Sequence, residues 1–285
     1  MSQEMGIGLM KNLKIVDFNS SINDGQMNTA ASFYPEGIDA SARREIMNLN
    51  KQRLMDKIGL NYQNIFIPIQ KNSKNPDRYI DGTSYTLTKE DINNYDDLYN
   101  YDVYTDIVKL TPETRNVSIA FPAADCAVIK AVNTKTNEVV LSHCGGEYID
   151  RYLPMQTIDS LGGNEKDIKV YVSPFAYTLT YNDPSKLVWA NDKRVWNGCK
   201  TFIENNENVS LKVNVYKALK RQLLERKILE DNLFISPYDI TESDLFYSNS
   251  KGYQDKKYAG RNLFGIALVD EDKNIKETDL IKTIK

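Results

Sequence analysis

Apolar residues recur at helical spacing in two segments of this chain. In residues 40–59, the apolar side chains near one helical face are those of Ile46, Leu49, Leu54 and Ile58, and the segment ends at a glycine, a common C-terminal stop. The spacing predicts a helix over 40–59 whose apolar stripe packs in the core.

A second helix is predicted over residues 213–229. Val215, Leu219 and Leu223 share one face of it, and lysines and arginines occupy the opposite face. This arrangement is typical of a solvated amphipathic helix rather than of a basic binding patch.

Short β-rich runs alternate with these helices. Residues 64–70 predict a strand that Pro68 interrupts, which places it near a sheet edge, and residues 167–173 and 262–269 predict two further strands. Helices and strands interleave without a linker-like tract or an internal repeat. The pattern therefore predicts the α/β (α+β) class, as a single compact domain over residues 1–285 in which helices flank mixed sheets.

A polar stretch rich in tyrosine and asparagine spans residues 72–105. It is long for a plain connection, so we expect either a surface insertion or a lid. Its tyrosines could offer stacking faces to a ligand ring, although a solvated insertion explains the same composition.

Two apolar runs, 126–132 and 138–143, flank polar turn-formers and predict a β-hairpin. With a loop centred near Lys135, residues that face each other have numbers adding up to about 270. Cys126 and His143, the only histidine of the chain, add up to 269. Within one residue, we expect them to be cross-strand neighbours on one face, with Cβ atoms roughly 4.5–5.5 Å apart.

A thiol and an imidazole at that separation can share a hydrogen bond, a proton or a metal ion. Burial explains the pair equally well, because cysteines and lone histidines are often core residues. Other site classes lack their motifs: the chain has no Gly-rich nucleotide loop and no G-x-S-x-G elbow. The spacing alone leaves packing and chemistry evenly balanced.

Composition and charge limit the partners. The chain has 41% hydrophobic and 26% charged residues, as soluble globular proteins do, and its net charge of −3 argues against a nucleic-acid binder. No stretch approaches the roughly 20 apolar residues of a membrane span, and residues 1–11 lack the pattern of a signal peptide. Three irregularly spaced cysteines suit a reducing compartment. We expect a cytoplasmic protein without nucleic-acid or membrane partners.

Two chemistries fit Cys126 and His143. In the first, they hold a metal ion that activates water or polarises a substrate oxygen. A catalytic zinc site normally has three protein ligands, so the third would be a carboxylate, Cys144, Cys199 or an amide, although Cys144 would point to the opposite face of a regular strand. In the second, Cys126 is a nucleophile that His143 activates. Asp125 would point away from the pair, and we expect a structural role for it.

The residues around this pair resemble a known family. The string A-A-D-C-A-V-I-K, with His143 seventeen residues after the cysteine, is similar to the T-A-D-C-x-P-V…H-A-G-W-R-G core of the polyphenol oxidase or laccase-domain family. Blocks at 104–109, 170–177 and 245–268 resemble that family's pattern in the same order. The resemblance implies a laccase-domain or cysteine-hydrolase-like fold, with the purine nucleoside phosphorylase type of activity and, in some members, adenosine deamination.

The chain also departs from the family's pattern. Family members bind zinc through two histidines and one cysteine; Cys126 and His143 match two of these, whereas Asn72 stands where the first histidine is expected. An amide oxygen is a poorer zinc ligand than imidazole, so the resemblance implies a weakened or lost zinc site. The motif's tryptophan and arginine are absent from 143–148, which weakens the case for phosphate binding, while Arg261 matches the family's last arginine.

The resemblance thus implies a purine nucleoside phosphorylase-like enzyme that acts on adenosine- or inosine-type nucleosides, and it leaves phosphate and water open as the second substrate. Cys126 and His143 would be catalytic and, with Asn72, would hold the zinc; Asn72 and Arg261 would contact substrate. Two alternatives stay open. One is a metal-free cysteine hydrolase or deamidase that uses Cys126 and His143, as in bacterial toxin deamidases of the same fold class. The other is a non-catalytic member that binds nucleosides or nucleotides.

Overall fold

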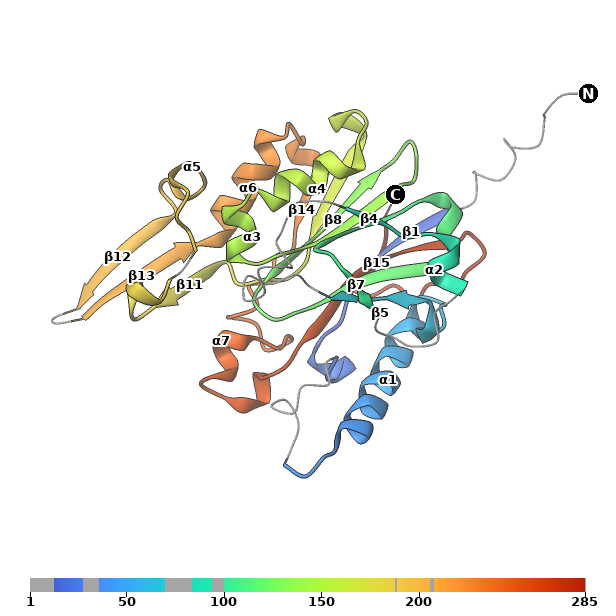
Figure 1. Cartoon of the computed structure of the whole chain (residues 1–285), viewed down its shortest axis with the longest axis horizontal. Helices are drawn as coiled ribbons and strands as arrows, with labels where there is room; N and C mark the ends of the chain where they lie inside the picture. The colour runs from blue at the N-terminus through green and yellow to red at the C-terminus, as the bar shows by residue number, and fades with distance from the viewer. Residues whose placement is uncertain are drawn as a thin grey trace, which may run out of the picture.

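The computed structural model describes residues 13–27, 36–69, 84–93, 100–187, 189–205 and 208–284, which contain two large sheets (Figure 1). The five-stranded sheet has the order β16-β1-β15-β7-β2, with β1 at Leu13–Asn19, β2 at Ile65–Phe66, β7 at Val117–Ala123, β15 at Asn262–Asp270 and β16 at Ile281–Ile284. The six-stranded sheet has the order β14-β10-β8-β9-β6-β4, with β4 at Tyr85–Thr86, β6 at Ile107–Leu110, β8 at Ala127–Asn133, β9 at Val139–Cys144, β10 at Ile168–Val172 and β14 at Leu233–Ile235.

Helices lie between these strands in the sequence. Their bounds are Ala40–Lys57 for α1, Lys89–Asn93 for α2, Gly146–Asp150 for α3, Leu153–Leu161 for α4, Lys193–Trp196 for α5, Val215–Glu225 for α6 and Asn249–Gly252 for α7. α6 and strands β10 and β15 confirm three of the elements predicted from the sequence. The predicted strand 64–70 is divided at Ile67 into β2 and β3 (Pro68–Ile69), and β3 pairs with β5 (Asn100–Tyr104) instead of joining a large sheet.

The two large sheets pack face to face, and helices cover their outer faces (Figure 1). Phe121 and Ile266 of the five-stranded sheet share one buried cluster with Val128 and Leu141 of the six-stranded sheet. A second cluster packs α4 and α6 onto the outer face of the six-stranded sheet, and a third packs α1 onto the five-stranded sheet. The layers run helix, sheet, sheet, helix, which confirms the predicted mixed α/β class with flanking helices.

α1 confirms the helix predicted over 40–59, and Leu54 and Ile58 of the predicted stripe are fully buried. Ile46 and Leu49, expected in the core stripe, are 37% and 53% exposed, so that part of the prediction was wrong. The buried face passes through Met47 and Leu54, both fully enclosed. The buried positions of α1 therefore start at Met47, one position after Ile46, and continue at helical spacing through Leu54.

β8 and β9 form the predicted hairpin in a shifted register. Val128, rather than Cys126, lies opposite His143. The shift arises in the loop, where Asn133 N donates to Glu138 O at 3.0 Å and centres the turn half a residue later than predicted. Cys126 is therefore a diagonal neighbour of His143 on the same face, and the expected direct pairing was wrong by two residues.

Three strands outside the large sheets form an arm that projects to the left in Figure 1. They are β11 (Thr178–Tyr181), β12 (Lys200–Asn205) and β13 (Asn208–Asn214), in the order β11-β13-β12. We call these strands the arm. α5 precedes β12 in the sequence, and α6 follows β13 directly.

The segment 72–105 is described in part. It contains β4, which pairs with β6 at the edge of the six-stranded sheet, and also α2 and β5. Residues 70–83 and 94–99, including Asn72, lie outside the described residues. The proposed insertion or lid stays a prediction. None of the described helices is long and apolar enough to cross a membrane.

Candidate active site

Three chain segments meet at the end of the β8–β9 hairpin and position the candidate residues. Cys126 directly precedes β8, His143 lies in β9, and Gly145 forms the N-cap of α3. The backbone N–H of His143 donates to the Asp106 carbonyl oxygen at 3.1 Å, which joins the start of β6 to the same place.

Gly145 lies between the thiol and the imidazole. A Cβ atom built on this glycine would be 3.1 Å from Cys126 Sγ and 3.9 Å from His143 Cε1. The two side chains therefore flank one point in space, as the sequence predicted, even though their strands pair differently. Only a residue without a side chain leaves that point open.

Burial sets the protonation of both groups. It raises the pKa of the Cys126 thiol to about 12, with a smaller contribution from the Asp125 carboxylate, while the Arg261 charge opposes the shift. Burial also lowers the pKa of His143 to about 4, and Arg261 lowers it further. At neutral pH the site thus holds a protonated thiol beside an uncharged imidazole.

Aromatic rings hold the imidazole in place. The ring centroid of His143 is 6.0 Å from that of Phe121 and 5.4 Å from that of Tyr148, which meets it edge-on. Within the described residues, His143 Nδ1 is buried and has no hydrogen-bond partner. An unsatisfied nitrogen at this depth is unfavourable unless a ligand, an ion or water pairs with it.

Asp125 has the structural role that its position predicted, through residues far along the chain. Its carboxylate accepts hydrogen bonds from Ser248 Oγ at 2.6 Å and from the N–H and hydroxyl of Ser250, both at 2.7 Å. Its own backbone has φ +81°, a conformation that few residues other than glycine adopt. The three bonds fix this turn directly before Cys126.

Arg261 lies close enough for its charge to act on both candidate residues. Its backbone N–H donates to Gln26 Oε1 at 2.8 Å, and its Nη1 donates to the Gly260 carbonyl at 3.0 Å. The sequence left open whether this arginine approaches the site, and the fold brings it there at the start of β15.

Two aromatic residues near the arm were missed by sequence reasoning. Tyr181 lies near the site: its pKa is raised to about 12, mainly by burial and also by the Cys126 and Asp125 charges. Trp189 packs on Gly146 so closely that a Cβ there would lie 2.5 Å from two carbons of the indole. Their sequence separation from Cys126 exceeds fifty residues, and no local motif marks them.

The described donors fit a zinc ion only in part. Cys126 and His143 offer two of the three ligands that a catalytic zinc site uses, and no group of three His, Cys, Asp or Glu side chains gathers within the described residues. Cys144 packs on the opposite face, 3.4 Å from Ser142 Oγ, as its strand position predicted. Cys199 directly precedes β12, and its sulfur contacts Arg221. The predicted third ligand, Asn72, lies outside the described residues.

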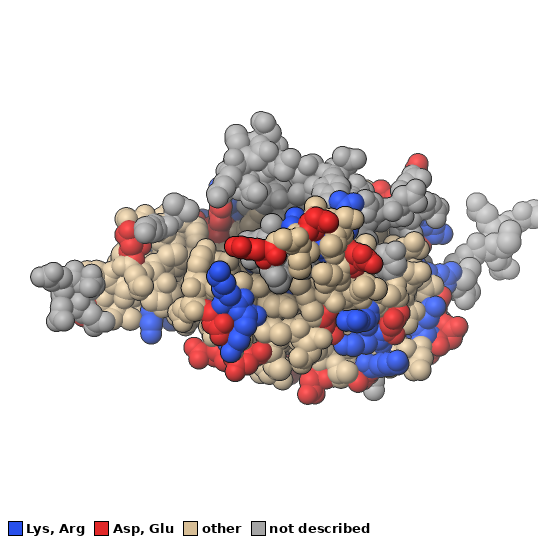
Figure 2. Space-filling model, turned by 90° about the horizontal axis from the view of Figure 1, so that it is seen from below, with Lys and Arg blue, Asp and Glu red and all other residues tan. Residues whose placement is uncertain are grey.

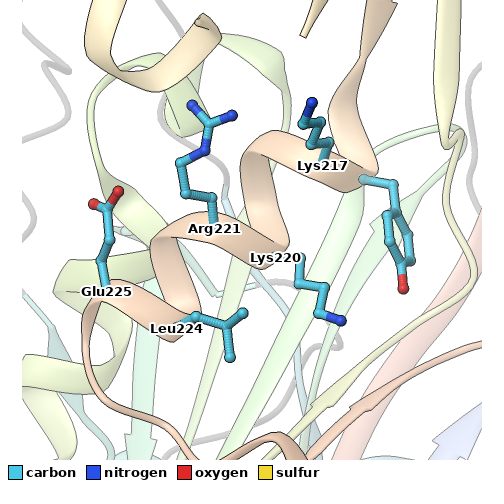
Figure 3. Close-up of a pocket in the computed structure, with 6 residues that line it drawn as sticks. Lys217, Lys220, Arg221, Leu224 and Glu225 are labelled. Carbon is cyan, nitrogen blue, oxygen red and sulfur yellow. The ribbon is translucent and has the colours of Figure 1, made fainter. Parts of the chain in front are cut away.

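A hollow on the surface of α6 is distinct from this site (Figure 3). It has a volume of about 670 Å³ and is lined by Tyr216, Lys217, Lys220, Arg221, Leu224 and Glu225. Its cations are already engaged: Lys217 Nζ donates to the Gly198 carbonyl at 3.0 Å, and Arg221 donates to carbonyls of the α5 segment. Acidic and basic side chains also mingle on the face drawn in Figure 2. The engaged cations of α6 agree with the solvated helix face predicted for 213–229.

Comparison with known proteins identifies relatives of this fold. Residues 37–269 match the family model described as "Multi-copper polyphenol oxidoreductase laccase". The fold is similar to that of the hypothetical protein YfiH from Bacillus licheniformis, with 16% identity, a TM-score of 0.64, and 89% of this chain and 92% of that chain covered. It is also similar to YlmD from Geobacillus stearothermophilus, with 17% identity, a TM-score of 0.60 and coverage of 94% and 98%.

A third similar structure comes from Neisseria meningitidis, with 13% identity, a TM-score of 0.62 and coverage of 90% and 95%. No curated protein matches the sequence. At these identities the structural likeness concerns the fold.

Proposed function

Because the chain belongs to the multi-copper polyphenol oxidoreductase laccase family, we propose that it is a purine nucleoside phosphorylase-like enzyme acting at the Cys126–His143 site. The observation that carries the proposal is the uncharged, buried imidazole beside the thiol, with the Arg261 charge acting on both. Perturbed titratable groups that converge in one place are a mark of catalytic sites.

His143 serves as the proton relay. Phosphorolysis breaks the bond between the purine nitrogen and the ribose carbon, forms a bond from that carbon to a phosphate oxygen, and moves the phosphate proton to the purine. An uncharged imidazole whose Nδ1 lacks a partner among the described residues can take that proton and pass it on. A pKa near 4 makes the imidazole a weak base, so its protonated form returns the proton readily.

Arg261 supplies the positive charge for the phosphate. A guanidinium pairs well with phosphate oxygens. The arginine of the H-A-G-W-R-G motif is absent from residues 143–148, so Arg261 has this role alone. Tyr181 and Trp189 offer ring faces for the purine, at the side of the site where the arm begins. None of these roles requires a metal ion. Zinc held by Cys126, His143 and Asn72 stays a prediction.

The test is phosphate-dependent release of the base from adenosine and inosine. We expect His143→Gln to lower kcat by roughly 100-fold or more, as loss of a proton-transfer group does, and Arg261→Gln to raise the KM for phosphate. Cys199→Ala, at a buried thiol directly before β12, is the matched control for Cys126→Ala and should keep full turnover. Turnover that survives in both Cys126→Ala and His143→Gln would refute the proposal.

A cysteine hydrolase is the second candidate. Cys126 Sγ and the His143 imidazole lie on either side of Gly145, an arrangement that suits a nucleophile and its base. A thiol pKa of about 12 argues against it, since the thiolate is the nucleophile. We expect iodoacetamide to label Cys126 slowly near neutral pH. Rapid labelling that ignores chelators would favour the hydrolase, and nucleoside binding without any turnover would favour the non-catalytic alternative.

A further inference from the structure

The arm ends in an open sheet edge. In the order β11-β13-β12, strand β12 has β13 as its single partner strand within the described residues. Figure 1 shows the arm standing away from the two large sheets. An edge strand presents unpaired N–H and C=O groups, which can pair with another strand.

The register shows which residues of β12 face that edge. Asn214 N donates to the Cys199 carbonyl at 2.7 Å, one step before the pair Lys200↔Val213, so residues 199 and 214 form a hydrogen-bonded pair. Hydrogen-bonded and non-hydrogen-bonded pairs alternate along an antiparallel ladder. The backbone groups of Lys200, Phe202 and Glu204 therefore point away from β13, toward the open edge.

The side chains of these three residues also share one face, because strand residues alternate. Lys200 and Glu204 are exposed, and Phe202 is 62% exposed, unusual for a phenylalanine. Thus a cation, an aromatic ring and an anion follow one another at two-residue steps along the edge. When the same strand runs antiparallel beside it, each lysine faces a glutamate and the two phenylalanines face each other.

We propose that a second copy of this chain pairs its β12 antiparallel to this one, about a two-fold axis at Phe202. Phe202 then faces Phe202 of the partner subunit, Lys200 faces the partner's Glu204, and Glu204 faces the partner's Lys200. Each opposed pair exchanges two backbone hydrogen bonds, because the edge-facing groups of both strands fall in register. The interface is isologous, as in most homodimers.

Other registers lose this match. A register shift of one residue sets an edge-facing residue against a residue whose backbone groups already bond β13. A register shift of two residues, which moves the axis by one residue, sets Phe202 against a charged side chain of the partner. The charges thereby select one alignment, as opposite charges on facing strands do. The proposal uses residues outside the catalytic site, so failure of the nucleoside assay would leave it standing.

Charge reversal tests the interface. Sedimentation velocity of the full chain over a concentration series should show wild type reaching twice the chain mass of 32.6 kDa. We expect Lys200→Glu and Glu204→Lys alone each to weaken dimerisation by about tenfold or more, because each turns two attractive pairs into two repulsive ones. The double variant K200E/E204K should dimerise like wild type, and a mixture of the two single variants should form heterodimers.

Lys212→Glu is the matched control, because it reverses an exposed charge on the central strand β13 of the same arm. It should dimerise like wild type, and Phe202→Asp should be monomeric with unchanged circular dichroism. A wild type that stays monomeric throughout the series overturns the proposal, as does a double variant that fails to recover or a K212E as disruptive as K200E.

Discussion

At the residue scale, burial rather than residue identity decides what His143 can do. Enclosure by Phe121 and Tyr148, together with the Arg261 charge, keeps the imidazole uncharged in the folded protein. The same ring in the unfolded chain takes up a proton at its ordinary pKa, so the difference links folding to pH.

The linkage predicts a pH-dependent loss of stability. The folded-state pKa is about 4, below the ordinary value of 6.5, so the unfolded state binds the extra proton first as the pH falls. Stability that is fully present above about pH 6.5 is lost progressively down to about pH 4, by about 3 kcal/mol.

Urea unfolding of chelator-treated protein at several pH values measures this loss of free energy of unfolding. His143→Gln should remove this component, and because the chain has one histidine, the difference between the two curves isolates it. Parallel curves would contradict the prediction.

The sequence could place Cys126 and His143 together because side-chain alternation preserves the face even when the register slips by two residues. It could not place Arg261, Tyr181 or Trp189, since those positions depend on how strands far apart in the chain pair. The catalytic and ligand roles assigned to the site residues stay predictions.

At the element scale, the turn before β8 depends on a distant segment. Asp125 holds a positive φ and ties the turn to the start of α7 through the hydrogen bonds of Ser248 and Ser250. The sequence predicted a structural role for this carboxylate, but its partners lie more than 120 residues further along, where no local pattern reveals them.

Asp125→Ala should therefore destabilise the protein by about 2–4 kcal/mol, since it removes charge-assisted hydrogen bonds and puts alanine at a positive φ. Asp125→Asn should lose less, because asparagine tolerates that backbone and keeps one acceptor oxygen. Chemical denaturation measures both. Asp255→Ala, which removes an exposed helix-capping carboxylate, is the control and should lose clearly less than Asp125→Ala. Equal losses would show that the turn does not need the Asp125 carboxylate.

At the scale of the whole molecule, a buried lysine joins the two large sheets. Lys130 extends from β8 to β1, where its ammonium pairs with the Asp17 carboxylate and donates to Asn19 Oδ1 at 2.7 Å and to the Phe18 carbonyl at 3.2 Å. Burial lowers its pKa, and the Asp17 charge opposes that shift. These partners offset the free-energy cost of burying the ammonium group.

Lys130→Met should lower the free energy of unfolding by about 3–5 kcal/mol, because it leaves the Asp17 carboxylate without its buried partner. Lys135→Met removes a lysine that is 69% exposed and pairs with Asp167, and it should change stability by less than about 1 kcal/mol. Urea unfolding at neutral pH compares the two. Similar losses in both would mean that the sheets do not depend on this ion pair.

Much of the fold class could be predicted from the sequence, because the helices and buried strands have strong local patterns. The layer order could not, since it rests on pairings such as Ile15 with Ile284, which join the beginning of the described chain to its end. The arm was missed as well, although β13 (N-V-S-L-K-V-N) alternates apolar and polar residues as a half-buried strand does. The predicted helix 213–229 took in Val213 and Asn214, which end this strand directly before α6.

The contact between Gly146 and Trp189 limits how the family motif can be restored. Gly146 occupies the place of the motif's tryptophan, and an indole from 43 positions further along already lies against it. Returning the motif's tryptophan to position 146 would force two bulky rings into one volume. In this fold, a side chain at position 146 and the indole of Trp189 therefore exclude each other, so the glycine and the tryptophan can change only together.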